Sequence, residues 1–519
     1  MKESIKFLLL ISFVEGAMVM ATELLSAKMI TPYFGATVPV WSSVLGITML
    51  GLSLGYFVGG RISVSKRSKD ILYRIILVAS ILTCLLPVIG PAIMDKLIEI
   101  EDFRIAAVLS SLLFILPVMF CYGMVPPLVI HKISSDIDDA GTKTGRVYAV
   151  STVGGVLMTL LTGFYLLPEI GIRHTAIIVG AVFGLCAVYF LLKSKSLLTA
   201  LVVLFSYFLV SFFSLSQLNR EITNPDFAEV YSTNTLHGSM KVIDYKLKET
   251  RALYNNNISQ SYMHLPTGRS QWTYVHRLAT YTSFLPAGSE VFLVGLGGGN
   301  LVTEFNLLKF QVDVCDIEPR TVEIARNYFG MPEPRSITID DARHKINNCQ
   351  HQYDLVVLDV SAGEIQPSNL YTVEGFSAIK KMLKENGVVF IHYPTVMGGE
   401  EALALKSILK TMEEVGFKVG LINTGPYPDI IREQFVVASL HDFNLEQQNF
   451  DRRLPFAEPF GFVTSGDFML DDFDYSKGLI LTDDMPIMDE LHYGISQRHR
   501  KDGINVTVKG MLNSGLKMF

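Results

Sequence analysis

The chain has 519 residues, of which 49% are hydrophobic, and its mean hydropathy is +0.35. That length exceeds one ordinary globular domain, and that hydropathy excludes a wholly soluble enzyme of this size. The formal net charge of −6 offers no basic surface for nucleic acid, so nucleic acid is not an expected partner.

The hydrophobic residues are concentrated in the first part of the chain. Residues 1–216 contain about seven apolar segments, each about long enough to cross a hydrocarbon core of about 30 Å as a helix. We therefore predict a transmembrane helical bundle that contacts the lipid bilayer of a cell membrane. The segments are Ile5–Ala27, Val40–Gly60, Ile71–Met94, Ile105–Ile130, Val147–Leu167, Thr175–Leu192 and Leu197–Leu215.

Two carboxylates lie within the first of these segments. Glu15 and Glu23 are eight residues apart, which places them roughly 80° apart around a helix, so both can face the interior of the bundle. Because a carboxylate in lipid is costly, contact with a cation or polyamine is one interpretation. Pairing with Lys28, Arg61 or the backbone is the other. The segment is too long and too charged for a cleavable signal peptide.

Beyond residue 216 the composition becomes that of a soluble protein. Residues 226–288 are predicted to form a small β-element and a connecting helix, because Ser239–Tyr245 alternates in polarity and Asn255-Asn256-Asn257 marks a turn before Ile258. Helical spacing follows over Trp272–Leu285.

A glycine-rich loop opens the next predicted domain, residues 289–500. A buried-type strand, Glu290–Val294, is followed by the loop and then by a helix from Leu301. Glycine suits this position because the chain turns sharply and a Cβ would keep the backbone away from a ligand at the helix N-terminus. The candidate ligand-binding residues of the loop are Gly295, Gly297, Gly298, Gly299 and Asn300.

Acidic residues follow three further predicted strands. Val312–Cys315 is followed by Asp316 and Glu318, about twenty residues after the glycine loop, where a carboxylate accepts hydrogen bonds from ribose hydroxyls in a βαβ unit. The strands over 336–339 and 353–358 are followed by Asp340-Asp341-Ala342 and by Asp359, respectively. Because parallel strands bind ligands at their carboxyl ends, we expect one site at this edge of an α/β Rossmann-like sheet.

An S-adenosyl nucleotide fits this pattern better than a nicotinamide dinucleotide. The loop is not a clean G-x-G-x-x-G followed by a long helix, and no second mononucleotide-binding half is apparent. Asp341 and Ala342 also suit a contact to the adenine amino group. The cysteines have no metal-type spacing, so neither a metal nor a disulfide is expected.

Motifs over nearly the whole chain resemble the membrane-fused polyamine aminopropyltransferases, or spermidine synthase-like proteins. In the apolar half they are Glu23–Lys28, Pro32–Gly35, Trp41, Gly51–Tyr56, Gly59–Arg61, Gly145–Ala149, Gly154-Gly155 and Leu167–Gly171. In the second half they are Arg251–Leu253, Gln260-Ser261, Tyr274, Gly297–Gly299, Asp341-Ala342, Asp354 to Asp359 and Leu481–Pro486.

This resemblance implies transfer of a 3-aminopropyl group from decarboxylated S-adenosylmethionine to the amine of putrescine, with release of methylthioadenosine. By motif, Asp359 would hold the amine and accept its proton, and Tyr274 would position it. Gln260, with Asp316 or Glu318 and with Asp341, would contact the nucleoside.

Three positions depart from the family pattern. Asn300 stands where members carry an aspartate that holds the aminopropyl ammonium, and Ala362 stands where they carry a second carboxylate. The Tyr-His-Glu stretch of the soluble enzymes appears as Tyr274-Val275-His276. Glu364 and His392 lie near the same predicted strand ends, where they could hold an amine or act as a base. A solvated surface position for Glu364 and a core position for His392 are the alternatives.

Two other functions stay open on the sequence. One is an S-adenosylmethionine-dependent methyltransferase or alkyltransferase acting on a hydrophobic substrate, and the other is a non-catalytic, transporter-like protein that senses polyamines. The oligomeric state is also open, with a homodimer as one candidate. Residues 501–519 are expected to form a C-terminal tail.

The loop charges predict an orientation for the bundle. The basic loop Arg61–Arg74 should be cytoplasmic, which places the N-terminus inside. Seven crossings would then put the nucleotide domain outside, where S-adenosyl nucleotides are not expected. We expect the domain to be cytoplasmic and one segment of the pair 175–215 not to cross.

Overall fold

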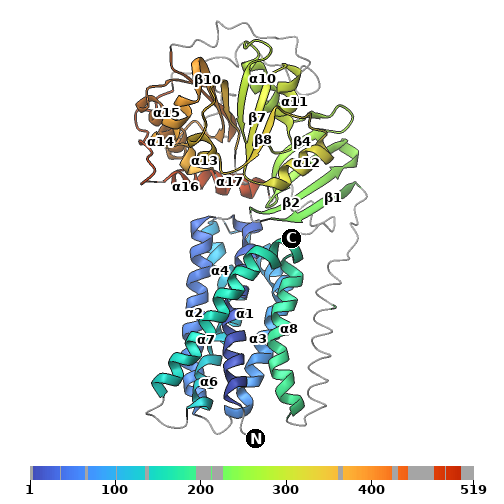
Figure 1. The fold of residues 1–519 in the computed structure, drawn as a ribbon, viewed down its shortest axis with the longest axis vertical. Helices are drawn as coiled ribbons and strands as arrows, with labels where there is room; N and C mark the ends of the chain where they lie inside the picture. The colour runs from blue at the N-terminus through green and yellow to red at the C-terminus, as the bar shows by residue number, and fades with distance from the viewer. Residues whose placement is uncertain are drawn as a thin grey trace. The chain divides into compact units, whose positions relative to one another are not determined.

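The computed structural model describes most of the chain, and Figure 1 shows its fold. The described residues are 4–35, 37–64, 68–100, 102–134, 140–193, 212, 226–235, 237–360, 366–422, 431–441, 473–485 and 487–503. They divide into two compact units, one containing the apolar helices and one containing both β-sheets.

The first unit is a bundle of helices that run side by side (Figure 1). Six helical segments in the described part of the chain are long and apolar enough to cross a membrane: Ile5–Phe34, Val38–Ser63, Ile71–Leu97, Leu116–Ile133, Ala140–Ile170 and Ile172–Phe190. They correspond to the first six predicted spans, while the seventh, Leu197–Leu215, falls outside the described residues apart from Phe212. The helices are α1 (Ile5–Phe34), α2 (Val38–Ser63), α3 (Ser68–Leu97), α4 (Phe103–Phe114), α5 (Leu116–Gly123), α6 (Val125–Ile133), α7 (Ala140–Leu161), the π-helix η1 (Thr162–Ile170) and α8 (Ile172–Lys193).

The fourth span differs from its prediction as one continuous helix over Ile105–Ile130. The structure breaks this region into α4, α5 and α6, with Ile115 and Met124 between them. The breaks coincide with Pro117 and Pro126, which stand in the first turns of α5 and α6. Proline has no backbone N–H and clashes with the preceding turn, so an uninterrupted helix is not maintained there.

The second unit begins with a five-stranded sheet of strand order β1-β2-β3-β4-β5. Its strands are β1 (Phe227–Asn234), β2 (Ser239–Tyr245), β3 (Thr250–Asn255), β4 (Ile258–His264) and β5 (Arg269–Ser270), and the short 3₁₀ turn η2 (Lys246–Lys248) joins β2 to β3. Asn256 and Asn257 have φ of 49° and 65°, values that asparagine tolerates and that a tight hairpin requires. The predicted Asn-rich turn is therefore confirmed.

A seven-stranded mixed sheet follows, in the order β11-β12-β10-β9-β6-β7-β8. The strands are β6 (Glu290–Val294), β7 (Gln311–Asp316), β8 (Ser336–Ile339), β9 (Tyr353–Leu358), β10 (Leu383–Thr395), β11 (Lys418–Ile422) and β12 (Arg432–Ser439). β12 runs antiparallel to both of its neighbours, and the other pairs are parallel. This arrangement confirms the α/β Rossmann-like class predicted from the sequence.

Helices cover this sheet (Figure 1). They are α10 (Thr273–Thr282), α11 (Asn300–Leu307), α12 (Pro319–Phe329), α13 (Ala342–Asn347), α14 (Val373–Lys381), α15 (Leu403–Glu414), α16 (Met488–Leu491) and α17 (Tyr493–Gly503), with 3₁₀ turns η3 (Ser368–Leu370) and η4 (Glu400–Ala402). Within β6, Phe292 and Val294 belong to one buried cluster and Val291 and Leu293 to another. Both faces of the sheet are thus buried, which explains the continuously apolar central strands.

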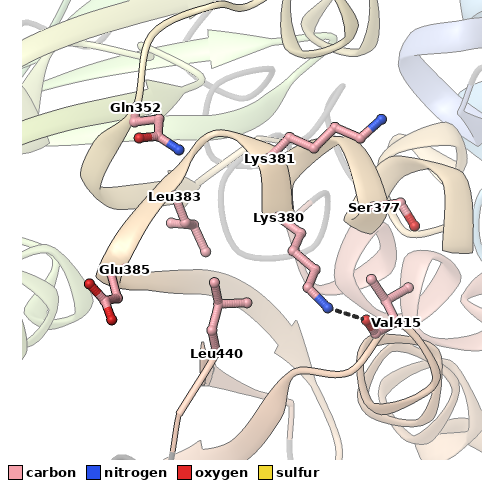
Figure 2. Close-up of a pocket in the computed structure, with 8 residues that line it drawn as sticks. All are labelled: Gln352, Ser377, Lys380, Lys381, Leu383, Glu385, Val415 and Leu440. Atoms are coloured by element: carbon pink, nitrogen blue, oxygen red, sulfur yellow. Dashed lines mark hydrogen bonds between the residues drawn. The ribbon is translucent and has the colours of Figure 1, made fainter.

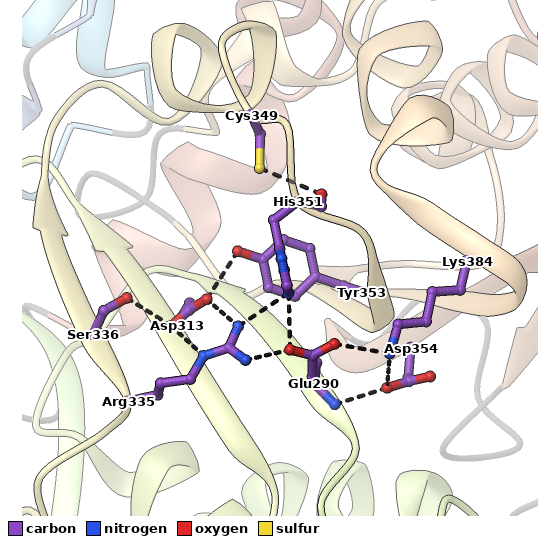
Figure 3. Close-up of polar contacts among 9 residues, drawn as sticks. All are labelled: Glu290, Asp313, Arg335, Ser336, Cys349, His351, Tyr353, Asp354 and Lys384. Carbon is purple, nitrogen blue, oxygen red and sulfur yellow. Dashed lines mark hydrogen bonds and ion pairs between the residues drawn. The ribbon is translucent and has the colours of Figure 1, made fainter.

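A charged network closes the amino-terminal edge of this sheet (Figure 3). Lys384 lies 2.9 Å from Glu290 and 2.8 Å from Asp354, while Arg335 pairs with both Glu290 and Asp313. The hydrogen bonds from Lys384 and Arg335 lower the pKa of Glu290 to about 2. Asp354, part of the family-like motif, therefore takes part in a structural network.

An open groove lies at the same amino-terminal edge (Figure 2). Leu383 at the start of β10 and Leu440 just after β12 contribute apolar walls, and Lys380 donates a hydrogen bond to the carbonyl oxygen of Val415 at 2.8 Å. None of the residues predicted to bind the ligand or catalyse the reaction lines this groove. The candidate site is at the opposite ends of the strands.

Candidate active site

The candidate site is centred where β6 and β9 end side by side. The chain order reverses here, because β6 has β7 on one side and β9 on the other, and such switch points are where open α/β sheets bind ligands. Val294 pairs with Leu358, so Gly295 and Asp359 follow adjacent strand ends. Gly295 has φ of 93°, and a Cβ there would overlap the carbonyl oxygen of Asp359. Glycine is therefore required to bring the loop against Asp359.

The small sheet holds the glycine loop in place. The backbone N–H of Gly298 donates to the hydroxyl of Ser261 at 2.8 Å, and that hydroxyl donates to the carbonyl oxygen of Gln260 at 2.7 Å. Gly297 and Gly299 adopt φ of 53° and 75°, the left-handed region that favours glycine. β4 thus places Gln260 beside the loop, where the nucleoside was expected.

The two carboxylates after β7 bind backbone amides. Asp316 accepts hydrogen bonds from the N–H groups of Leu296 at 2.9 Å and Glu318 at 2.8 Å, so its side chain fixes the path of the glycine loop. Glu318 caps α12 by accepting from the N–H of Arg320 at 3.0 Å, and it is buried.

The acidic residues after β8 lie at the same edge of the sheet. Asp340 accepts from the N–H of Asp341 at 2.8 Å and contacts Nδ1 of His344 at 2.7 Å, and this histidine contact lowers the pKa of Asp340. Asp341 caps α13 by accepting from the N–H of His344 at 3.0 Å, and Ala342 is the first residue of that helix. Strand-end acids from β7, β8 and β9 thus share one edge.

Asp359 is held by side chains from two other elements. The Tyr274 hydroxyl of α10 donates to Oδ2 at 3.3 Å, and Nδ1 of His392 in β10 lies 2.6 Å from Oδ1. Nε2 of His392 in turn contacts the Glu433 carboxylate of β12. The rings of Tyr274 and His392 are stacked, with centroids 3.9 Å apart and planes 8° apart. Both oxygens of Asp359 are consequently oriented.

The charge state of this group follows from its surroundings. Burial favours a neutral His392, but Glu433 and Asp359 outweigh it and raise the pKa of His392 to about 10. Burial and the neighbouring Asp359 hold the pKa of Tyr274 well above its usual value, so its hydroxyl remains a donor. At neutral pH an imidazolium therefore lies between two carboxylates, and the group has one net negative charge.

A row of aromatic rings connects Asp359 to the glycine loop. The ring of Trp272 lies 5.5 Å from that of Tyr274 and 5.5 Å from that of Tyr262. The backbone carbonyl of Tyr262 accepts a hydrogen bond from the Asn300 amide at 3.2 Å, at the start of α11. Aromatic faces attract cations, so this row suits a positively charged ligand such as a sulfonium or an ammonium.

Two other residues of the family-like motifs, His276 and Asp483, contact neighbouring side chains that support the fold. His276 is buried and contacts the carbonyl oxygen of Ser270 at 2.8 Å and Glu304 at 3.5 Å, so it supports α10 rather than pointing to Asp359. Asp483 pairs with Arg343 at 2.8 Å and accepts from the hydroxyl of Thr372 at 2.7 Å, in keeping with a structural cap. Ala362 and Glu364 lie outside the described residues.

Sequence reasoning missed Glu433 altogether and left His392 between two interpretations. Glu433 follows His392 by 41 residues and reaches it only because β12 returns antiparallel to β10, with Glu433 paired to Pro394. No motif marks this position. For His392, a signal was available, because the residue lies on the next predicted strand after Asp359. In the structure the His392 ring contacts the Asp359 carboxylate directly.

Comparisons with known proteins find similarity to aminopropyltransferases and to a methyltransferase. Residues 241–439 match the family model described as the spermine/spermidine synthase domain. Polyamine aminopropyltransferase 2 of Aquifex aeolicus is 24% identical over 409 residues, which cover 75% of this chain and 79% of that protein. The N-terminal histidine N-methyltransferase of Emericella nidulans is 34% identical over 114 residues, covering 21% of this chain and 20% of that protein. The spermidine synthase of Thermotoga maritima, a solved structure, is 18% identical, covers 50% of this chain and 97% of its own, and has a TM-score of 0.38.

Proposed function

Because the chain carries a spermine/spermidine synthase domain and is a transferase of the aminopropyltransferase family, we propose that it transfers an aminopropyl group from decarboxylated S-adenosylmethionine to a putrescine-like amine. The observation that supports this most is the position of Asp359. Its backbone adjoins the glycine loop at Gly295, and Tyr274 and His392 orient its two carboxylate oxygens.

The donor would bind along the edge formed by β6, β7 and β8. Gln260 and Asp316 flank the glycine loop and are the candidates for contacts to the ribose, with Glu318 as the buried alternative. Asp341 and Ala342 are the candidates for the adenine. The sulfonium tail would then lie along the aromatic row that includes Trp272, toward Asp359.

The acceptor would bind at Asp359. Its neutral amine nitrogen attacks the carbon beside the sulfonium, the C–S bond breaks, and sulfur keeps the electron pair as methylthioadenosine leaves. The nitrogen loses one proton, which the Asp359 carboxylate accepts. The sulfonium is already a good leaving group, so positioning by Tyr274 and His392 supplies most of the acceleration.

The single net negative charge around Asp359 limits the positive charge that an acceptor can carry in this site. It matches one positive charge on the acceptor, whose attacking nitrogen is already neutral. Asn300 contributes an amide where the family pattern has a carboxylate, and the loss of a charge-assisted hydrogen bond costs roughly 1.5–3 kcal/mol. We therefore propose an acceptor that carries one ammonium besides its neutral attacking nitrogen, and putrescine is the first acceptor to test.

The cell membrane is the proposed location, with the sheet-containing unit in the cytoplasm, where sulfonium nucleotides are found. The six long apolar helices support a multi-pass membrane protein. A reporter fused after Phe519 tests the orientation: cytoplasmic activity of the reporter is expected, and extracytoplasmic activity would overturn the assignment.

Product analysis tests the proposed reaction. Detergent-solubilised full-length protein is incubated with putrescine and either decarboxylated S-adenosylmethionine or S-adenosylmethionine. We expect methylthioadenosine and an aminopropylated amine from the first donor. Adenosylhomocysteine from the second donor would instead establish the methyltransferase alternative, and polyamine uptake without binding of either donor would establish the transporter-like one.

A further inference from the structure

The helical unit contains a cavity of about 240 Å³ that has no part in the proposed transfer. It lies between α1, α2 and α7. Water occupies about 30 Å³ per molecule in the liquid, so this space holds several water-sized groups. Its lining combines a single carboxylate with apolar, small and hydroxyl-bearing side chains. The lining residues used below are Glu15, Val19, Met20, Leu52, Tyr56 and Ser151.

Close packing of two helices shapes this cavity. A Cβ at Gly16 of α1 would overlap the carbonyl oxygen of Ser151 in α7, and a Cβ at Gly154 of α7 would overlap that of Phe13. The small residues therefore let the backbones meet. Gly155, whose Cβ would stand 3.0 Å from Met20, also lines the cavity and leaves the space beside Glu15 open.

Glu15 is in the middle of the apolar layer. It follows Ile5 by ten residues, or about 15 Å along the helix, which is about half the thickness of a hydrocarbon core. The side chain is 2% exposed. An ionised carboxylate at this depth is costly unless a cation pairs with it.

The partner that the structure provides for Glu15 is a hydroxyl. Ser151 donates to Oε2 at 3.0 Å, and among the described residues no lysine or arginine forms an ion pair with Glu15. The sequence had allowed pairing with Lys28 or Arg61 as an explanation of this carboxylate. A hydroxyl contributes a hydrogen bond but no charge, so the carboxylate is left for a cation from outside the chain.

We propose that this cavity binds a primary ammonium group carried on a single aliphatic chain, with Glu15 as the counter-ion. Val19, Met20 and Leu52 provide apolar walls for the chain, and the Tyr56 ring provides a face for the ammonium. A divalent inorganic cation is usually bound by several carboxylate and carbonyl oxygens, and Glu15 is the single carboxylate among the lining residues. A diamine fits less well, because its second ammonium would enter the apolar layer without a counter-ion.

Calorimetric titration of the full-length protein in detergent with hexylammonium chloride tests the proposal. The Glu15→Gln variant should lose at least tenfold in affinity. Glu23→Gln removes the other carboxylate of the same helix and should bind like the wild type, since Glu23 is not among the lining residues. Because all samples share the same micelles, partition of the amine into detergent cancels. Equal binding by wild type and Glu15→Gln would overturn the proposal.

Ligand shape provides a second test. Affinity should rise up to about fourfold for each methylene from propylammonium to hexylammonium, and 1,6-diaminohexane should bind at least tenfold more weakly than hexylammonium. Leu52→Trp, which fills the cavity without changing Glu15, should weaken hexylammonium binding while methylthioadenosine still binds to the other unit. Hexanol binding as tightly as hexylammonium, or Leu52→Trp binding normally, would contradict the assignment.

Discussion

Replacing Asp359 with asparagine is the change that tests the proposed chemistry. The amide has the shape of the carboxylate, and its oxygen can still accept a hydrogen bond from His392. Its NH2 group can accept neither the hydrogen bond from Tyr274 nor the proton of the amine. Asp359 touches the glycine loop through its backbone, at the carbonyl oxygen that crowds Gly295. Nucleoside binding and proton transfer should therefore separate in this variant.

The expected magnitude follows from the role assigned to the carboxylate. Proton transfer to a positioned base contributes about 10²–10⁴ in rate. At 1.36 kcal/mol for each tenfold change, this corresponds to about 3–5 kcal/mol of barrier. We expect kcat of Asp359→Asn to fall by that factor, while the Kd for methylthioadenosine changes by less than about threefold. Methylthioadenosine is neutral, so its affinity does not report the lost charge.

The assay is release of methylthioadenosine at saturating donor and putrescine, with calorimetry for the Kd. Glu333→Gln is a matched control, because Glu333 pairs with Arg326 on the surface and its side chain is 66% exposed. A drop in kcat of less than tenfold for Asp359→Asn, or a parallel loss of methylthioadenosine affinity, would refute the role of Asp359 as the proton acceptor.

Three further predictions concern the supports of the site. In the wild type the Arg269 guanidinium lies 3.0 Å from the fully buried Glu304 carboxylate. Glu304→Gln removes this charge partner and should lower the free energy of unfolding by about 3 kcal/mol. An unchanged midpoint of thermal unfolding would contradict this prediction. His392 has a folded-state pKa raised from 6.5 to about 10, so its stabilising contribution is complete below pH 6.5 and is lost as the pH rises through 10. At pH 6 the free energy of unfolding of the wild type should be roughly 2 kcal/mol higher than that of His392→Gln, allowing for solvent screening at the half-exposed Glu433. This difference should vanish above pH 10. A difference that does not change with pH would contradict the assigned charge state. Asn300→Asp should raise the affinity for decarboxylated S-adenosylmethionine about tenfold through a charge-assisted hydrogen bond, and should leave the affinity for methylthioadenosine unchanged, both measured by calorimetry. An unchanged affinity for the donor would show that Asn300 does not contact its aminopropyl tail.

The centre of the candidate site was predictable because it depends on local chain direction. A glycine loop after one parallel strand and an acid after another must meet if the strands are neighbours, and Gly295 and Asp359 do.

The length of β9 places the two aspartates of one family-like motif at opposite edges of the sheet. Asp354 and Asp359 are five residues apart in and after β9, or about 16 Å, which puts Asp354 in the network at the opposite edge.

The surroundings of Asp359 were not predictable, because they depend on tertiary register. Glu433 reaches His392 through antiparallel pairing of β10 with β12, and neither strand carries a local signal for that register. The same limit applies to the apolar half. Hydropathy located the six long apolar helices of the described residues, but the breaks at Ile115 and Met124 follow from prolines within an otherwise continuous apolar run.

Calorimetric titration of the full-length protein with decarboxylated S-adenosylmethionine tests most directly whether the glycine loop and the strand-end acids form one nucleotide pocket. We predict binding of one donor per chain, competition by methylthioadenosine, and loss of both in Gly295→Val, whose side chain would push the loop away from Asp359. Failure of the wild-type protein to bind either ligand, or undiminished binding by Gly295→Val, would contradict the account.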